Sequence, residues 1–443
     1  MADIKVAMIS LGCAKNLVDS EQMLYRLKNA GYVLSENAEG ADVVVVNTCG
    51  FIEDAKREAI ENILQLAELK KEGKIGAIIA AGCLAQRYKD EFFKELPEVD
   101  AIVGTGSYSD ITEAVKAVTK GGKSEYFSDI DTYLDEGERI LATPRYSAYL
   151  KIAEGCDNRC AYCVIPSIRG KYRSRKMENI IKEAKELSNR GVKEIIVIAQ
   201  DITRYGTDIC GERKLHELLD KISDIDGIEW VRLHYLYPDE IDERLIDTIA
   251  RNDKIVKYFD IPVQHASDRI LSTMNRRGDS NFLRKLFSDI RRKMPDAVLR
   301  TSFITGLPGE TDEDFDILCR FAEDIGFERA GVFAFSPEEG SKAFDMPDQV
   351  DHETAVKRQE ILQQILSRGA DKFGRRMTGK TMRVLCEGFN KETGMFYGRS
   401  YADSPDIDGT VYFESNQKIK CGEFADVMIK SYEEYDMTGI IAG

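Results

Sequence analysis

Residues 149–163, YLKIAEGCDNRCAYC, join a β-rich apolar run to a loop that carries three cysteines. Cys156, Cys160 and Cys163 are spaced as C-x-x-x-C-x-x-C. Thiolates at this spacing can surround one corner of a cuboidal [4Fe–4S] cluster, which takes one protein ligand on each iron. Three ligands leave one iron open to chelate the amino and carboxylate groups of a small molecule. Structural zinc usually needs four ligands, and no fourth cysteine or histidine lies near this loop, so zinc is the weaker alternative.

Five further β-rich runs follow this one, each separated from the next by a helical pattern. Strands and helices that alternate in this way predict right-handed crossovers and a parallel sheet. Six such units predict an open, partial (β/α) barrel over residues 142–374, with a last helix from His352 to about Gly374. The strands are expected at residues 149–153, 194–198, 230–234, 258–263, 299–304 and 331–335.

Residues 1–120 predict a separate domain, a small doubly wound parallel α/β fold, because short apolar runs alternate with amphipathic stretches. Gly121, Gly122 and the polar residues after them predict a linker over residues 121–141. Strands are expected at residues 5–10, 43–47, 77–81 and 101–103, and helices at residues 19–30, 53–70, 86–94 and 110–118.

Residues 375–443 change character. Short alternating runs punctuated by glycine and aspartate predict a small antiparallel β-barrel. From Arg376 onward this segment carries 8 Lys and Arg against 11 Asp and Glu. An acidic barrel favours a basic protein partner over a nucleic acid.

A second trio of cysteines occupies equivalent positions in the N-terminal domain. Cys13, Cys49 and Cys83 each follow one of the first three predicted strands, and a glycine adjoins each cysteine. Loops after parallel strands emerge at one edge of a sheet, where ligands bind. The alternative is three structural cysteines, since free cysteine is among the most buried residue types. Their shared position favours a second cluster, again with one open iron.

Composition limits the remaining possibilities. The 443 residues carry a formal net charge of −15, which argues against tight non-specific binding to nucleic acid. The most apolar stretch, Ile75–Ala85, is too short to span a membrane, and no secretory signal is visible at the start. We therefore expect a cytoplasmic protein without membrane contact, whose ten cysteines are metal ligands or thiols rather than disulfides.

Together these motifs resemble the radical S-adenosylmethionine methylthiotransferases over essentially all 443 residues. The resemblance is specific in LGCAKNLVDSEQM, NTCGFIEDAK, AGCLAQRY, GCDNRCAYCVIPSIRGKYRSR and TGLPGET. It implies an N-terminal cluster domain, a radical S-adenosylmethionine barrel and a C-terminal barrel of the TRAM type. It also implies two [4Fe–4S] clusters and S-adenosylmethionine as cofactors, with all six cysteines of the two trios as ligands.

Within that family, the motifs are most similar to enzymes that act on an aspartate of small-subunit ribosomal protein S-twelve, free or in the subunit. The implied reaction is methylthiolation of the aspartate β-carbon. S-adenosylmethionine serves as the methyl source and as the source of a 5′-deoxyadenosyl radical, which removes the hydrogen. A reductant such as flavodoxin or ferredoxin is also implied, whereas the sulfur donor is not identified. No side-chain acid or base is required.

The resemblance also assigns contacts to S-adenosylmethionine. Tyr162 would lie beside the adenine, and Ala199-Gln200-Asp201 takes the place of the family's Gly-Gly-Glu, which contacts the methionine amino group. For Tyr162 the alternative is ordinary packing. For Gly306 and Gly309, which are also expected contacts, the alternative is a tight turn. The remaining expected contacts are Gln264, Ile304, Gly306 and Gly309.

Two other functions remain open on the sequence alone. The first is a transfer-RNA adenosine methylthiotransferase with the same chemistry, and the second is a non-catalytic protein that binds zinc and RNA. A basic run after the cysteine loop could contact ribosomal RNA or the target carboxylate, or could simply be solvated. Its members are Arg169, Lys171, Arg173, Arg175 and Lys176.

Overall fold

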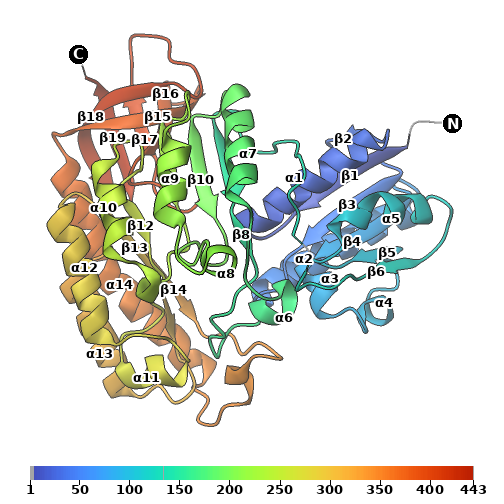
Figure 1. Ribbon diagram of the computed structural model, residues 1–443, viewed down its shortest axis with the longest axis horizontal. Coiled ribbons are helices and arrows are strands. Elements are labelled where there is room, and N and C mark those ends of the chain that lie inside the picture. The colour runs from blue at the N-terminus through green and yellow to red at the C-terminus, as the bar shows by residue number, and fades with distance from the viewer. Residues whose placement is uncertain (1–3, 133, 443) are drawn as a thin grey trace.

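The computed structural model describes residues 4–132 and 134–442 and confirms the predicted fold class. Figure 1 shows an N-terminal α/β unit on the right, a central unit of strands and helices, and a small barrel at the upper left. No helix in the described part of the chain is long and apolar enough to cross a membrane.

The N-terminal unit is a six-stranded parallel sheet in the order β2-β1-β3-β4-β5-β6. The central strand β3, VVVVNT, is buried at all six positions, as expected for a sheet covered on both faces. Its strands are β1 (Lys5–Ser10), β2 (Val33–Ser35), β3 (Val43–Thr48), β4 (Ala77–Gly82), β5 (Ala101–Val103) and β6 (Ser124–Tyr126). Its helices are α1 (Ala14–Asn29), α2 (Glu53–Lys71), α3 (Cys83–Arg87), α4 (Phe92–Glu95) and α5 (Ile111–Val118).

Several N-terminal elements differ from expectation. Helix α1 begins at Ala14, five residues before the expected start, because its first turn is packed against other parts of the chain rather than exposed. The helix expected over residues 86–94 is divided into α3 and α4. Strands β2 and β6 are three residues each and lack the buried apolar side chains that mark the equally short β5. Strand β6 lies within the segment expected to be a linker.

The central unit contains two three-stranded parallel sheets, β11-β10-β7 and β12-β13-β14. They meet through a parallel bridge between Val231 and Ile255, so the six strands form one open arc. This is the predicted partial barrel. Its strands are β7 (Ser147–Lys151), β10 (Glu194–Ile198), β11 (Trp230–Leu233), β12 (Tyr258–Asp260), β13 (Val298–Thr305) and β14 (Arg329–Ala334).

Helices cover the outer face of this arc, and a short antiparallel pair flanks the cysteine loop (Figure 1). That pair is β8 (Ala153–Glu154) and β9 (Arg173–Ser174). The helices are α6 (Ile165–Arg169), α7 (Met177–Asn189), α8 (Thr207–Cys210), α9 (Leu215–Ser223), α10 (Glu243–Arg251), α11 (Asp268–Thr273), α12 (Ser280–Lys293), α13 (Asp312–Ile325) and α14 (His352–Met377).

Helix α1 packs against the inner face of the arc. Val18 contacts Ile196 and Ile198 of β10, whereas Ile195 and Val197 belong to the separate core beneath the helices. Because side chains alternate along a strand, Ile196 and Ile198 face the barrel interior. The N-terminal domain therefore brings the start of α1, and Cys13 before it, to the inside of the barrel.

The C-terminal segment is a closed barrel in the order β15-β16-β17-β19-β18, as predicted. The strand pairs are antiparallel as expected, except that β17 and β19 run parallel. It joins the central unit through buried charges, such as the pair of Glu194 and Arg399, with 2.6 Å between Oε2 and Nη2. Nε2 of His234 lies 2.9 Å from Oγ of Ser404, so His234 belongs to this interface. Its strands are β15 (Thr381–Asn390), β16 (Met395–Ser400), β17 (Val411–Glu414), β18 (Phe424–Glu433) and β19 (Asp436–Ile441).

Candidate active site

The loops that carry Cys13, Cys49 and Cys83 touch one another at the carboxyl edge of the N-terminal sheet. Gly12 has a φ of +83°, and a Cβ there would lie 2.6 Å from Cβ of Cys49. Gly82 has a φ of +93°, and a Cβ there would lie 2.7 Å from the carbonyl oxygen of Thr48. Only glycine permits both the left-handed backbone and these close approaches. The structure thus brings the three predicted loops together.

Asn16, in the first turn of α1, connects all three loops. Its amide nitrogen donates to the carbonyl oxygens of Leu11, at 3.1 Å, and Thr48, at 3.0 Å. Its amide oxygen lies 3.6 Å from Sγ of Cys83. Asn16 is fully buried, so these bonds are shielded from water.

Arg169 of α6 reaches Cys83 from the central unit, with 3.4 Å between Nη2 and Sγ. Burial raises the pKa of the Cys83 thiol to about 12, and the guanidinium opposes that rise. Burial also raises the pKa of Cys49. Thiols of this kind lose their protons when a metal binds, because coordination deprotonates a thiol outright.

The second trio lies on one loop. The backbone N–H of Cys156 donates to the carbonyl oxygen of Gly170, and that of Cys163 to Cys160, at 3.1 and 3.0 Å. Gly155 has a φ of +77°, and a Cβ there would lie only 2.0 Å from the carbonyl oxygen of Lys171. The return segment after the loop therefore closes tightly over its start.

Cys160 has polar neighbours of its own. Its Sγ lies 3.6 Å from the hydroxyl of Tyr237 and 3.7 Å from Nη1 of Arg276. Arg276 is buried, stacks on the Tyr237 ring at 4.0 Å, and donates to the carbonyl oxygen of Pro262 at 2.6 Å. Burial raises the pKa of Cys156 to about 11 and raises that of Cys163 as well.

The two trios are neighbours in space. Cys83 packs against Val164 and Ile168, which lie one and five residues after Cys163 in the chain. Arg169 continues this contact, since its guanidinium binds Asp19 and Asn16 of α1 and Glu154 beside the second trio. Lys151 joins the same buried network by binding both Asp19 and Glu154.

The donor chemistry of both trios fits iron–sulfur clusters. Each offers three thiols, and all ten cysteines are free of disulfides. In the described residues, no three His, Cys, Asp or Glu side chains converge closely enough to hold one metal ion. A cuboidal cluster needs no such convergence because each thiolate binds a different iron. The cluster-ligand roles of the six cysteines stay predictions that this geometry suits.

Two of the expected S-adenosylmethionine contacts share an apolar wall. Tyr162 and Ile304 pack on one cluster of side chains with Leu307 and Phe335. A flat aromatic ring such as adenine suits a wall of this kind. Gln264, four residues after β12, has a φ of +72°, which a non-glycine residue adopts only under constraint.

The Ala199-Gln200-Asp201 segment separates into different roles. Nε2 of Gln200 donates to Glu154 at 2.6 Å, while its Oε1 is buried without a partner among the described residues. An unpartnered buried acceptor fits a ligand amino group. Asp201 instead binds Asn158 of the cysteine loop and Thr203, so it positions that loop. Ala199 is wholly buried in the core.

The two glycines after β13 differ. A Cβ at Gly306 would lie 2.3 Å from Cβ of Ala355 in α14, so close helix packing already accounts for this glycine. At Gly309 the nearest atom would be 3.7 Å away, on Arg269. Both have a φ of +76°. The positive φ suits the tight-turn alternative at both glycines, and ligand contact stays a prediction for both.

The basic run is not a surface patch. Arg169 and Arg175 are only 3% and 2% exposed and bind internal carboxylates, whereas Lys171 and Lys176 point outward. The expectation of a run that is solvated or in contact with RNA along its whole length is therefore wrong, because internal carboxylates hold Arg169 and Arg175 inside the protein. Sequence patterns did not reveal the roles of Asn16, Arg169 and Arg276, whose partners lie far away in the chain.

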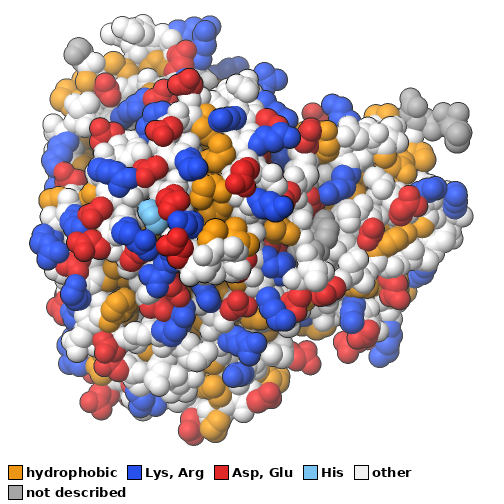
Figure 2. Space-filling view, in the orientation of Figure 1, with side chains coloured by type: hydrophobic (Ala, Val, Ile, Leu, Met, Phe, Trp, Pro, Cys, Tyr) orange, Lys and Arg blue, Asp and Glu red, His pale blue; other side chains and the backbone are white. Residues whose placement is uncertain are grey.

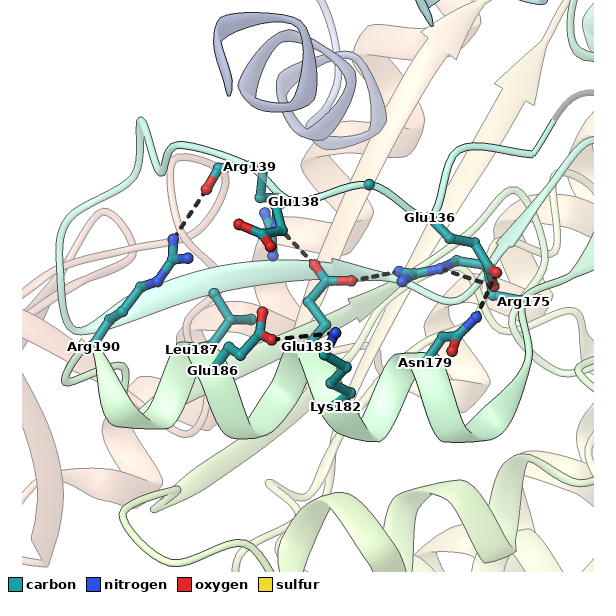
Figure 3. A pocket seen from close by; sticks show the side chains of 11 residues that line it. Glu136, Glu138, Arg139, Arg175, Asn179, Lys182, Glu183, Glu186, Leu187 and Arg190 are labelled. Atoms are coloured by element: carbon teal, nitrogen blue, oxygen red, sulfur yellow. Dashed lines mark hydrogen bonds and ion pairs between the residues drawn. The ribbon is translucent and has the colours of Figure 1, made fainter. Parts of the chain in front are cut away.

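A pocket of about 140 Å³ lies outside this region, between α7 and residues 136–139 (Figure 3). Glu183 lies between two arginines there, 2.8 Å from Arg139 and 2.7 Å from Arg175. The charges that line the pocket therefore satisfy one another, and no predicted site residue lines it.

Comparison with family models divides the chain into three matches. Residues 5–104 match the Uncharacterized protein family UPF0004, residues 150–322 the Radical SAM superfamily, and residues 378–441 the TRAM domain. In fold, the chain is similar to the radical S-adenosylmethionine methyltransferase TsrM from Kitasatospora setae. The TM-score is 0.56 at 14% identity, and the match covers 75% of each chain.

Full-length relatives are far more similar in sequence. The chain is 48% identical over 435 residues to the ribosomal protein uS12 methylthiotransferase RimO of Thermoanaerobacter sp. (strain X514), covering 98% of this chain and 99% of that one. It is 49% identical over 444 residues to the protein of the same name in Acetivibrio thermocellus, covering 98% of both. The chain therefore belongs to the ribosomal protein uS12 methylthiotransferase RimO family of radical S-adenosylmethionine enzymes.

Proposed function

We propose that this enzyme transfers a methylthio group to the β-carbon of an aspartate in ribosomal protein uS12. The observation that carries the proposal is the adjacency of two three-cysteine sites, joined where Cys83 packs on Val164 and Ile168. Each site has three thiol donors for a cluster that accepts four ligands, so each leaves one iron for another molecule. One site for radical formation and one for sulfur delivery are what this reaction requires.

The central unit would bind the radical-forming cluster and S-adenosylmethionine. Cys156, Cys160 and Cys163 would hold the cluster that, with S-adenosylmethionine bound, supplies the 5′-deoxyadenosyl radical. The buried Oε1 of Gln200 would accept a hydrogen bond from the amino group of S-adenosylmethionine. Tyr162 and Ile304 would flank its adenine.

Cys13, Cys49 and Cys83 would hold the second cluster, positioned by Asn16 and Arg169. The buried pairs of Arg169 and Lys151 with Asp19 and Glu154 would keep the N-terminal domain seated on the barrel. They would thereby hold the two clusters at a fixed separation and exclude bulk water from the space between them.

Surface charge favours a protein substrate over transfer RNA. Positive and negative side chains are intermixed on the face shown in Figure 2, without a large patch of one sign among its described residues. The net charge of −15 likewise opposes a polyanion. We place the reaction in the cytoplasm, where uS12 is made and where thiols stay reduced. A reductant such as flavodoxin or ferredoxin would supply electrons.

A reconstituted reaction tests the proposal. The purified anaerobic enzyme, S-adenosylmethionine, a sulfide source and dithionite are incubated with uS12 or, separately, with unmodified transfer RNA. The proposal predicts a methylthio mass on one aspartate of uS12 and none on transfer RNA. Methylthioadenosine with unmodified uS12 would establish the alternative substrate instead.

A further inference from the structure

Lys15 is a buried lysine close to the trio of Cys13, Cys49 and Cys83. It lies in the first turn of α1, two residues after Cys13, and is only 8% exposed. Its ammonium nitrogen sits 3.4 Å from the centroid of the Tyr235 ring. A cation this deeply buried is costly unless it has a partner, and an aromatic face satisfies only one side of an ammonium with three donors.

The carboxylates near Lys15 are already engaged. Among the described residues, none lies within ion-pair distance of Lys15, although Asp19 follows it by one helical turn. Asp19 binds Lys151 and Arg169, and Glu154 binds the same two cations. Two cations, Lys151 and Arg169, thus share these two carboxylates, and Lys15 pairs with neither of them.

Tyr235 places this ammonium inside the barrel. It follows β11 at the carboxyl end of the arc and packs with Ile196 and Ile198, which face the interior. Its backbone has a φ of +66°, and its N–H donates to Asp260 at 3.0 Å. A residue held in a left-handed conformation at a strand end is typical of a functional position. The ring therefore provides a fixed platform for Lys15.

We propose that Lys15 binds the side-chain carboxylate of the substrate aspartate, an inference that rests on the proposed function. A carboxylate accepts two strong hydrogen bonds from an ammonium and neutralises its charge. The aspartate β-carbon is bonded directly to the carboxyl carbon. Binding at Lys15 would thus place the reacting carbon beside Cys13, where the sulfur arrives. Adenosine has no carboxylate, so the same contact would discriminate against transfer RNA.

The test measures binding without turnover. The holoenzyme with S-adenosylmethionine and no reductant is titrated with uS12, or with uS12 whose target aspartate is replaced by asparagine. The expected wild-type preference for aspartate is at least tenfold. The Lys15→Met enzyme should lose this preference and bind both proteins equally weakly. The Lys15→Arg enzyme should retain part of the preference. In Lys28→Met, the same substitution at the exposed far end of α1, the preference should be unchanged.

Iron content and S-adenosylmethionine cleavage without uS12 show whether each variant is assembled. Equal affinity of the wild-type enzyme for both proteins overturns the inference, whatever Lys15→Met does. A preference that persists in an assembled Lys15→Met variant overturns it too. In either case, methylthiolation of uS12 by the wild-type enzyme leaves the proposed function standing. If the wild type does not modify uS12, the proposed function itself fails.

Discussion

The two cysteine sites are built in opposite ways. Cys156, Cys160 and Cys163 lie within eight residues on one loop. Cys13, Cys49 and Cys83 come from three loops that only the folded parallel sheet brings together. The first site is thus a local motif, and the second depends on tertiary structure. This difference leads us to expect that the same kind of damage will affect the two sites unequally.

Removal of the thiols should give the largest effect. Cys160→Ala should abolish reductive cleavage of S-adenosylmethionine, because the radical site loses a ligand. Cys49→Ala should leave cleavage intact and stop methylthio transfer. Product analysis for 5′-deoxyadenosine and for modified uS12 separates the two outcomes. Normal modified uS12 from Cys49→Ala would refute the two-cluster account.

Loss of Asn16 should damage only the site of Cys13, Cys49 and Cys83, which tertiary structure brings together. Asn16→Ala leaves the carbonyl oxygens of Leu11 and Thr48 without their donors, which costs about 1–3 kcal/mol for each buried group left unsatisfied. Iron should fall from about eight to about four atoms per chain, while S-adenosylmethionine cleavage persists. Asn62→Ala removes an exposed amide from the same domain and should change neither quantity. Iron loss from both sites would show that the sites are not independent.

Two arginines allow the reduction potentials to be compared. Arg169→Gln removes a cation beside Cys83, and Arg276→Gln removes one beside Cys160. Loss of a charged N–H···S contact worth about 1.4 kcal/mol should lower a one-electron potential by about 60 mV. Each variant should shift the potential of only its own cluster in a redox titration followed by electron paramagnetic resonance. Equal shifts of both clusters would contradict the assignment of one arginine to each.

Acidification should have a smaller effect, which is to destabilise the interface with the C-terminal barrel while both cysteine sites stay intact. Burial lowers the pKa of His234 to about 4 at the interface with the C-terminal barrel. A histidine with a depressed folded pKa contributes stability that is present above pH ~6.5 and is lost as the pH falls toward 4. Between pH 7.5 and 5 the loss should be about 2 kcal/mol.

Thermal unfolding at the two pH values measures this loss, with cluster absorbance as the control. Between pH 7.5 and pH 5, the melting temperature of His234→Gln should fall less than that of the wild type. Cluster absorbance below the unfolding transition should not differ between the two proteins. An identical fall in melting temperature in both proteins would show that His234 does not titrate as its burial implies.

Much of the architecture could be predicted from the sequence, because apolar residues recur along it with a short period. The run VVVVN and the strands near residues 194–198 and 299–304 carry patterns that local physics determines. The radical trio is likewise complete within eight residues. The three-residue strands β2 and β6 and the division of the helix at 86–94 escape such patterns, because packing rather than periodicity decides them.

The less predictable part of the site consists of long-range contacts. Lys15 and Tyr235 are 220 residues apart in sequence, and Arg169 reaches back to Cys83. In the sequence, Lys15 is an ordinary helix residue and Arg169 belongs to a basic run. Only the seating of α1 inside the barrel turns them into buried cations between two cysteine sites.

The most direct test of the central claim is peptide mass spectrometry of uS12 from the source organism, with and without this gene. The account predicts one aspartate that carries a methylthio group in the parent strain and is unmodified in the deletion strain. Restoring the wild-type gene should restore the modification, and restoring Cys49→Ala should not. A methylthio group that persists in the deletion strain, or that is absent from both, would contradict the account.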